Sequence, residues 1–388
     1  MKKLLLSVLM VMLAMPALAF EIPMPDGMSL KMYGQVRMNA VYDYKNVSNG
    51  ATNDIGSDFR MNWQGNSRFG INFSVGNFFA NAEMNVQPDQ AGSVGFRQFY
   101  GGYTFENGLT LIAGNKTTLA GTKISNTVWY TDGGLAGFGA ADDTRRPMIM
   151  VSYAGLDVAV VANVVDKTAK PSITIPGFSA AEEYIPRFEV AYNLKFDNFT
   201  GKIAGTYGLY TFDRDTDAKR FNVHAWHVGL TGKYNFGNMY AGVSAFYGMN
   251  SGMYGAANLI SGGATAYQSV SENPTIGEKS LGSYMIDGDS VEDVSTWGAT
   301  VVFGVNISEM LALEVGGGWQ QSYADFITND NGDKTALNGY GIYVQAPIKF
   351  AEGHFVITPE VGYFGRMADF TGAAIEELLA GAQVKVLF

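Results

Sequence analysis

The sequence of 388 residues contains no cysteine. An exported chain of this size without disulfides needs another source of stability. A closed ladder of backbone hydrogen bonds is one such source, because a barrel leaves no strand edge unpaired.

Charged residues are also scarce, at 16%, where about a quarter is usual for soluble domains. Beyond the first residues no apolar run reaches the 18 residues that would indicate a membrane-spanning helix. Aromatic residues are abundant at 13%, and there are 48 glycines. This composition favours an outer-membrane β-barrel.

The N-terminus has the features of a targeting segment. Lys2 and Lys3 precede an apolar run, and Ala17-Leu18-Ala19 forms an A-x-A cleavage site. We therefore expect residues 1–19 to be a signal peptide and residues 20–388 to be a single barrel domain, with a retained membrane anchor as the alternative. Without Lys2 and Lys3, 24 basic side chains oppose 36 acidic ones, which gives a net charge of −12. Such an acidic balance argues against nucleic acid as a partner.

Strict alternation of apolar and polar residues is the strongest pattern in the chain. Over residues 59–75 one face carries Phe59, Met61 and Trp63, and the other carries polar side chains. This length suits a tilted membrane strand, whereas strands of soluble sandwiches usually have about 5–6 residues. Sixteen such segments begin near residues 29, 59, 78, 95, 108, 147, 156, 184, 199, 220, 238, 294, 309, 337, 353 and 375.

The connections between these segments alternate between short and long. Gly76-Asn77 and Ala154-Gly155 are examples of the short Gly/Asn turns. The longest connections are 117–146 and 251–293. Short turns on one side and long loops on the other are typical of outer-membrane barrels, and an even strand count puts both termini on the short-turn side.

Two strands and the last residue resemble those of the Gram-negative outer-membrane diffusion porins. LKMYGQVRMNAVYDY (Leu30–Tyr44) resembles their first strand, and NSRFGINF (Asn66–Phe73) resembles their second. The chain ends in Phe388 on an alternating strand, as those porins do, and in that family the terminal aromatic residue is part of what the barrel-assembly machinery reads. The family's Pro-Glu-Phe-Gly-Gly type loop motif is absent, and GLAGFGAADD (Gly134–Asp143) stands in its place.

The resemblance implies an all-β fold: a sixteen-stranded antiparallel transmembrane β-barrel, assembled as a homotrimer in the cell outer membrane. It also implies a long third loop that folds inward, and the third long connection here is 117–146. The loop 251–293 competes for that position, but the strand count and the resemblance favour the third.

Side-chain alternation predicts a basic wall inside the barrel. The inward positions of the first, second and fourth strands, and the top of the fifth, carry the candidate constriction wall: Arg37, Arg60, Arg68, Arg97 and Lys116. Arginine stays charged at any ordinary pH. Each arginine has a structural alternative, which is to pair with an inward carboxylate such as Glu83 or Asp43 and brace the lumen.

The end of the third loop supplies opposite charges. Asp142 and Asp143 are expected to face the basic wall, which would set up a transverse field in the narrowest part of the pore. Arg145 and Arg146 are the remaining charges of the constriction loop. They could line the pore or hold the returning end of the loop on its own acids.

No chemistry beyond transport stands out. His224 and His227 are three residues apart and would face opposite sides of a strand, so they make no metal pair. No nucleophile elbow, phosphate loop or cofactor motif is visible. We expect no enzyme activity, no metal and no cofactor.

The predicted function is a water-filled channel for passive diffusion of small hydrophilic solutes and ions. The acidic balance tilts the expected ion preference towards cations. The alternatives are a substrate-selective porin for sugars or organic acids and, from another class, an outer-membrane enzyme or a structural or adhesive barrel. The expected partners are outer-membrane lipid and lipopolysaccharide, a homotrimer, and the barrel-assembly machinery.

Overall fold

A computed structural model describes most of the chain. The described residues are 20–22, 24–25, 27–49, 53–87, 93–128, 132–143, 145–162, 185–214, 216–255, 285–287, 289–328, 334–368 and 373–388. The expected signal peptide, residues 1–19, lies outside them.

The described chain is almost entirely β-strand. The strands are β1 (Phe20–Ile22), β2 (Met28–Asn49), β3 (Asn53–Trp63), β4 (Arg68–Val75), β5 (Phe78–Gln87), β6 (Ser93–Thr104), β7 (Thr110–Thr117), β8 (Arg145–Tyr153), β9 (Leu156–Val161), β10 (Arg187–Phe196), β11 (Phe199–Asp213), β12 (Arg220–Phe236), β13 (Met239–Met249), β14 (Met285–Asp287), β15 (Ser290–Glu292), β16 (Ser295–Asn306), β17 (Ala312–Thr328), β18 (Lys334–Gln345), β19 (Ile348–Phe350), β20 (Phe355–Ala368) and β21 (Ala373–Leu387). Two short 3-10 turns, η1 (Ser251–Tyr254) and η2 (Ala351–Gly353), complete the elements. Among the described residues, no helix has the length and apolar character needed to cross a membrane.

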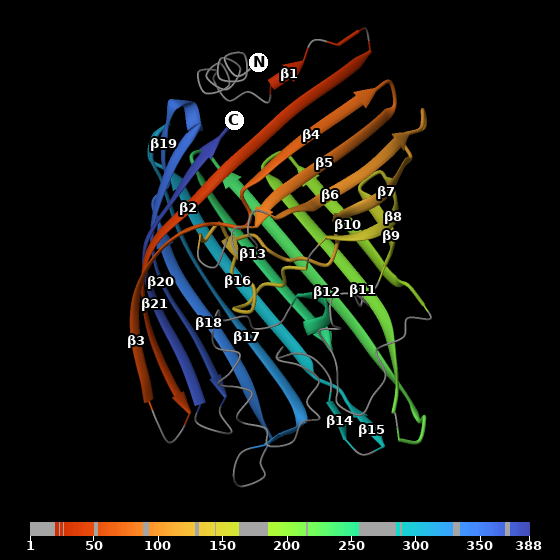
Figure 1. Cartoon of the computed structure of the whole chain (residues 1–388), viewed down its shortest axis with the longest axis vertical. Helices are drawn as coiled ribbons and strands as arrows, with labels where there is room; N and C mark the ends of the chain where they lie inside the picture. Colours follow the sequence, from red (N-terminus) through yellow and green to blue (C-terminus); the bar gives the residue numbers. More distant parts are fainter. Residues whose placement is uncertain are drawn as a thin grey trace.

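The strands form one closed antiparallel barrel (Figure 1). Each wall strand pairs with its neighbours along the chain, and β2 pairs with β21 from Gln35↔Leu387 to Asn49↔Ala373, which closes the ring. β3 and β4 follow one another along β2, and β18 and β19 follow one another along β20, so each pair makes one strand of the wall. The wall therefore has sixteen strands, as predicted, and β14–β15 is a separate hairpin.

The two faces of the wall differ in chemistry because successive side chains of a strand point to opposite sides. On β12, Val228 and Leu230 are exposed by 51% and 47%, whereas Val223 and His227 are fully buried. The exposed face is apolar around the ring, and most of the buried polar side chains belong to the other face. An apolar outside and a polar inside are what a membrane barrel requires.

The second wall strand differs from the prediction. Residues 59–75 were expected to run as one strand, but four residues, Gln64 to Ser67, turn inward between β3 and β4. These four residues lie opposite only two residues of β2, because Met38 pairs with Trp63 and Gln35 pairs with Arg68. The two extra residues form a bulge that keeps the inside–outside parity and carries Asn66 and Ser67 into the barrel.

The first and last strands of the chain begin and finish at the same end of the barrel, the end with the short turns. The start of β2 pairs with the end of β4, beside the short turn at Gly76-Asn77. β1 and the C-terminus lie at this end in Figure 1, and the β14–β15 hairpin lies at the opposite end. The last residue closes the ring: Phe388 exchanges two backbone hydrogen bonds with Gly34, of 2.6 and 3.0 Å. Its ring lies where a Cβ on Gly34 would be, 2.4 Å from that position, so this residue must be glycine unless the ring moves.

Candidate functional site

Three arginines of the predicted basic wall share one inner face. Arg37, Arg68 and Arg97 lie on β2, β4 and β6, and each interacts electrostatically with the other two or with their common carboxylate. Glu83 of β5 is that carboxylate: Arg97 Nε lies 2.8 Å from Glu83 Oε1, and Arg68 Nε lies 3.5 Å from Oε2. Tyr33 also donates to Glu83, at 3.1 Å. Arg68 and Arg97 thus pair with an inward carboxylate, which is the contact that the bracing alternative describes.

The other predicted wall residues lie further from this group. Arg60 pairs with Asp43 and lies 3.7 Å from Glu377, which is the bracing arrangement again. Lys116 lies over the ring of Tyr100, 5.7 Å from its centroid.

The third loop lies between β7 and β8 and contacts the polar face of nearby β10 and of the distant strands β17 and β20. Figure 1 shows it, in yellow, among the wall strands. The backbone N–H of Leu119 donates to Glu189 Oε2 on β10 at 2.6 Å. Asn126 donates to both oxygens of Glu314 on β17, at 3.0 and 2.5 Å. Thr127 and Val128 donate to Glu360 on β20, at 2.8 and 2.9 Å.

The returning half of the loop packs against the same wall through apolar side chains. Leu135 and Phe138 are fully buried, in a cluster with Tyr343 and Phe364 of the wall. The rings of Phe138 and Phe364 have centroids 5.4 Å apart. Gly139, with φ of 115°, lies so close to the backbone of Ala299 that a Cβ would be 2.2 Å from its carbonyl oxygen. Burying a side chain such as leucine or phenylalanine contributes about 1.5–3 kcal/mol each, so this cluster fixes the loop strongly.

The loop's acids have partners other than the expected ones. Asp142 was expected to face the basic wall, but it pairs with Lys123 of the same loop, at 2.9 Å. Asp143 was expected to do likewise, but it is buried and accepts from Arg187 of β10 at 2.5 Å and from Thr118 at 2.8 Å. Sequence distance explains the difference, because nothing local marks Arg187, at the start of β10, as the partner of Asp143.

Arg145 and Arg146 separate into different roles. Arg146 Nε lies 3.7 Å from Asp143 Oδ1, which is the contact expected if Arg146 holds the returning end of the loop on its own acid. Arg145 interacts electrostatically with Arg97, Glu83 and Asp142, which places it among the basic-wall charges.

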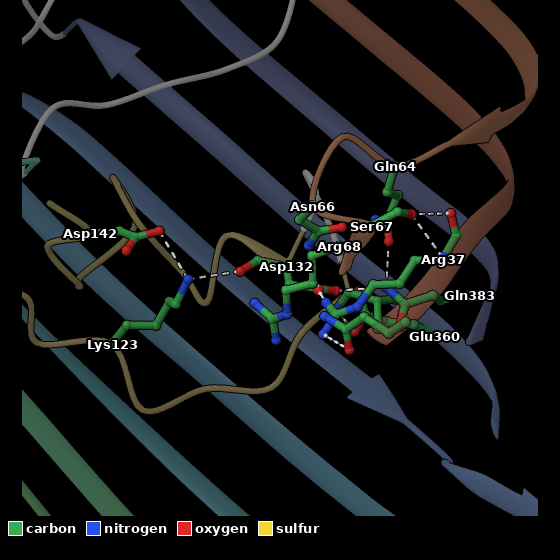
Figure 2. A network of polar contacts seen from close by, with 12 residues as sticks. Arg37, Gln64, Asn66, Ser67, Arg68, Lys123, Asp132, Asp142, Glu360 and Gln383 are labelled. Carbon is green, nitrogen blue, oxygen red and sulfur yellow. Dashed lines mark hydrogen bonds and ion pairs between the residues drawn. The ribbon is translucent and has the colours of Figure 1, made fainter. Parts of the chain in front are cut away.

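Asp132 is the carboxylate that meets the basic wall (Figure 2). It forms an ion pair with Arg37 and accepts from Asn66 Nδ2 at 2.8 Å and from Gln383 Nε2 at 2.7 Å. Lys123 links this point to the end of the loop, because its Nζ donates to the Asp132 carbonyl at 3.0 Å and to Asp142 at 2.9 Å.

Cations outnumber carboxylates around this part of the lumen. Among the described residues, Arg68 interacts electrostatically with Arg37, Arg97, Arg145 and Lys385. The carboxylates that interact with members of this group are Glu83, Asp132 and Asp142. Such a surplus makes the electrostatic potential at this face positive.

The loop 251–293 begins inside the barrel, which the sequence reasoning did not expect. Tyr254 of η1 is fully buried, donates to the Ala225 carbonyl at 2.7 Å, and lies under the Arg187 guanidinium, 4.3 Å from its ring centroid. The Asp142 N–H donates to the Gly255 carbonyl at 3.1 Å. The start of this loop therefore supports the end of the third one. Residues 256–284 and 288 lie outside the described residues.

The histidines face as predicted. His224 is on the outer face, bonded to Tyr207 at 2.8 Å, and His227 is buried on the inner face. The described ranges bring together no group of three or more His, Asp or Glu side chains that could hold a metal ion.

Sequence reasoning missed Asp132, Arg187, Glu314 and Glu360 as the residues that position the loop. A local signal existed only for the glutamates and Arg187, which are charges at inward positions of otherwise regular strands. Asp132 has none, because its role depends on where the loop ends in space.

No protein-family model matches the chain, and no curated protein matches it. Solved structures do match. The outer membrane channel DcaP of Acinetobacter baumannii has a TM-score of 0.69 at 16% identity, with 95% of this chain and 99% of that chain covered. OmpT of Vibrio cholerae, in a trimer form, has a TM-score of 0.51 at 13% identity, covering 94% and 100%. An anion-selective porin from Comamonas acidovorans has a TM-score of 0.53 at 11% identity, covering 93% and 100%. The chain has the sixteen-stranded barrel fold of the outer-membrane porins.

Proposed function

We propose that the protein is an outer-membrane porin, a water-filled channel through which small hydrophilic solutes and ions diffuse passively. The observation that carries this proposal is the closed sixteen-stranded wall with an exposed apolar outside and a charged inside. A soluble barrel would have to cover that outer face, whereas a membrane covers it directly.

We further propose that the third loop narrows the channel and leaves the passage between itself and the basic wall. Its contacts with Glu189, Glu314 and Glu360 support this, because those side chains belong to the polar face. The passage would then be bordered by Arg68, Arg97 and Arg145 on the wall and by Lys123 and Asp142 on the loop. Arg60 and Lys116 would stand nearer the outer rim.

Reconstitution in planar bilayers tests the channel. Purified protein is expected to give discrete conductance steps in sodium chloride. Tightly folded protein that gives no steps would contradict the proposal.

A second candidate is a porin selective for anionic solutes such as organic acids. The surplus of cations in the described lumen favours it over the cation preference that net charge suggested, because charges at the narrowest part outweigh those spread over the outer surface. The Comamonas acidovorans porin named above is described as anion-selective. A salt gradient across the bilayer decides: we expect a reversal potential that favours anions, and saturable block by an organic acid would mark selectivity for that solute.

We propose that the barrel assembles as a homotrimer through the outer face of β3 and β6. Phe59, Met61, Phe96 and Phe99 there are each more than 60% exposed. Within the described residues, β3 pairs with β2 alone and leaves its other edge open. The OmpT structure named above is described as a trimer form. Phe59→Ser with Met61→Ser is expected to give monomers in detergent, measured by light scattering, with Ile203→Ser elsewhere on the outer face as the control.

The remaining expectations follow from an outer-membrane position. Residues 1–19 would be removed on export, Phe388 would be read by the barrel-assembly machinery, and lipid and lipopolysaccharide would surround the apolar face. Deleting Phe388 is expected to reduce the amount of folded barrel in the membrane while leaving export unchanged.

A further inference from the structure

The carboxylate of Asp132 lies in a ring of donors that come from three separate parts of the wall. Arg37 belongs to β2, Asn66 to the bulge between β3 and β4, and Gln383 to β21. Both oxygens are engaged: Oδ2 by Arg37 and Asn66, and Oδ1 by Gln383 at 2.7 Å. Charge-assisted bonds of this kind are the strongest that a carboxylate makes in a protein.

The wall holds these donors in place without help from the loop. Gln383 donates to Gln64 Oε1 at 2.7 Å, and Arg37 Nη2 donates to Gln35 Oε1 at 3.1 Å. The bulge is fixed on β2, since Ser67 Oγ accepts from the Arg37 backbone N–H at 2.9 Å and the Gln64 N–H donates to the Arg37 carbonyl at 3.0 Å. Gln64 and Gln383 are each only 2% exposed. A carboxylate receptor is thus built into the wall.

The site also contains hydrogen-bond donors that Asp132 does not use. Arg37 Nε and Gln64 Nε2 are buried donors with no hydrogen-bond partner among the described residues. Buried donors of this kind normally find an acceptor. A solute carboxylate, free of the loop's geometry, could reach donors that Asp132 leaves unused.

On the loop side the contact is under strain. Asp132 has φ of 61°, a left-handed conformation that is unfavourable for a non-glycine residue. The Asp132 side chain is 21% exposed and that of Arg37 is 13% exposed. The pair between Asp143 of the same loop and Arg187 of β10 is less exposed, with side chains 3% and 1% exposed. Water and small ions can therefore reach the first pair but not the second.

We propose that the wall site formed by Arg37, Asn66 and Gln383 is a carboxylate-binding site whose resident ligand is the loop's own Asp132. Small monocarboxylates displace Asp132 and release the loop tip, residues 132–134, from the wall. The exchange replaces one carboxylate by another, so no covalent step or net charge change at the site is required. The proposal rests on the proposed channel function, because the tip borders the passage.

Single-channel recording with sodium chloride replaced stepwise by sodium acetate tests this. A tethered carboxylate competes at an effective concentration of the order of millimolar or more, so we expect a saturable rise in conductance with a midpoint of about 10–300 mM acetate. Asp132→Asn, which keeps the shape and removes the charge, is expected to show the released conductance in chloride alone and no saturable response. Asp217→Asn is the control, because Asp217 pairs with Arg214 in an exposed turn and contacts neither the third loop nor the wall site. It removes one carboxylate charge, as Asp132→Asn does, and is expected to respond as the wild type does.

A second measurement does not depend on ion mobility. The chain contains no cysteine, so Gly133→Cys gives a single thiol beside the tip. We expect acetate to accelerate its labelling by a soluble thiol reagent, and nitrate at equal concentration to leave the rate unchanged. In the Asp132→Asn background the rate should be high with either anion.

The outcomes separate the two proposals. Conductance steps that respond identically to acetate in wild type and Asp132→Asn, or labelling that acetate does not accelerate, would overturn the carboxylate site and leave the channel intact. Absence of any steps in chloride would overturn the channel itself, and the labelling result would then still decide the site.

Discussion

The two halves of the barrel interior are built differently. Strands β10 to β20 carry the third loop, which is fixed to them by buried glutamates, by Arg187 and by the cluster around Phe138. On strands β2, β4 and β6, Arg37 pairs with Asp132 of the loop, and Arg68 and Arg97 pair with Glu83 of the wall. The ion pairs of the first half are the more deeply buried: Arg187 and Glu189 are 1% and 0% exposed, whereas Arg68 and Arg97 are 29% and 12% exposed. We infer that stability is determined on one side of the passage and selectivity on the other.

The largest effect on stability should follow from removing the buried ion pairs of Arg187. Arg187→Met removes the buried cation that Asp143 and Glu189 share, which costs about 3–5 kcal/mol because a buried charge that loses its partner keeps its desolvation penalty. Denaturant unfolding of the detergent-solubilised barrel, with limited proteolysis of the loop, measures this. Arg220→Met is the control, since its pair with Asp213 is exposed, with Arg220 at 52%, and should change stability by about 0–1 kcal/mol. Equal losses in the two variants would show that the halves do not differ in this way.

The ion selectivity should change when the arginines of strands β2 to β8 are replaced. Reversing two charges by Arg68→Glu with Arg97→Glu is expected to lower the anion-to-cation permeability ratio about tenfold or more, because charges lining a narrow gap set the local ion concentration. The reversal potential in a salt gradient measures it. Lys195→Glu, near a short turn at the end of β10, changes charge away from the gap and should leave the ratio almost unchanged. An equal change of the permeability ratio in Lys195→Glu would show that the total charge of the protein, and not the charges beside the passage, determines the ion selectivity.

Removing an uncharged hydrogen bond between the third loop and strands β10 to β20 should have a smaller effect on stability. Ser125→Ala removes the bond from Ser125 Oγ to Tyr343 Oη, of 2.8 Å, and is expected to cost about 0.5–1.5 kcal/mol. Open-channel noise should rise slightly while the permeability ratio stays the same. A changed ratio with unchanged noise would contradict the division between the halves.

The smallest effect lies outside the lumen. Hydrogen bonding from Arg214 lowers the pKa of Asp217 from its ordinary 3.8 to about 2. Because the pKa is depressed in the folded state, the contact contributes fully above pH 3.8 and is lost as the pH falls towards 2. A fluorophore on a cysteine introduced at Thr216 should gain mobility over that interval. Gain of mobility at higher pH, or none, would show that this pair does not hold the 214–219 turn.

The strand framework was predictable from the sequence, and the partners of the loop were not. Alternation in segments such as 30–44 is local, so it fixes which side chains face inward, and Arg37, Arg68 and Arg97 were placed correctly for that reason. The bulge at Gln64–Ser67 was missed, because the alternation continues through it without a change of parity. The pairing of Arg68 and Arg97 with Glu83 was within reach of sequence reasoning, since neighbouring strands supply all three.

The sequence by itself determined a closed barrel of alternating strands with a basic inner wall and a long third connection, because each of these follows from periodicity and order along the chain. Only the tertiary structure decided which acid meets that wall. Asp142 and Asp143 stand at the end of the loop and looked closest to it, yet Lys123 and Arg187 hold them, and Asp132 reaches Arg37. A loop is positioned by contacts with strands far away in sequence, and no local pattern records those contacts.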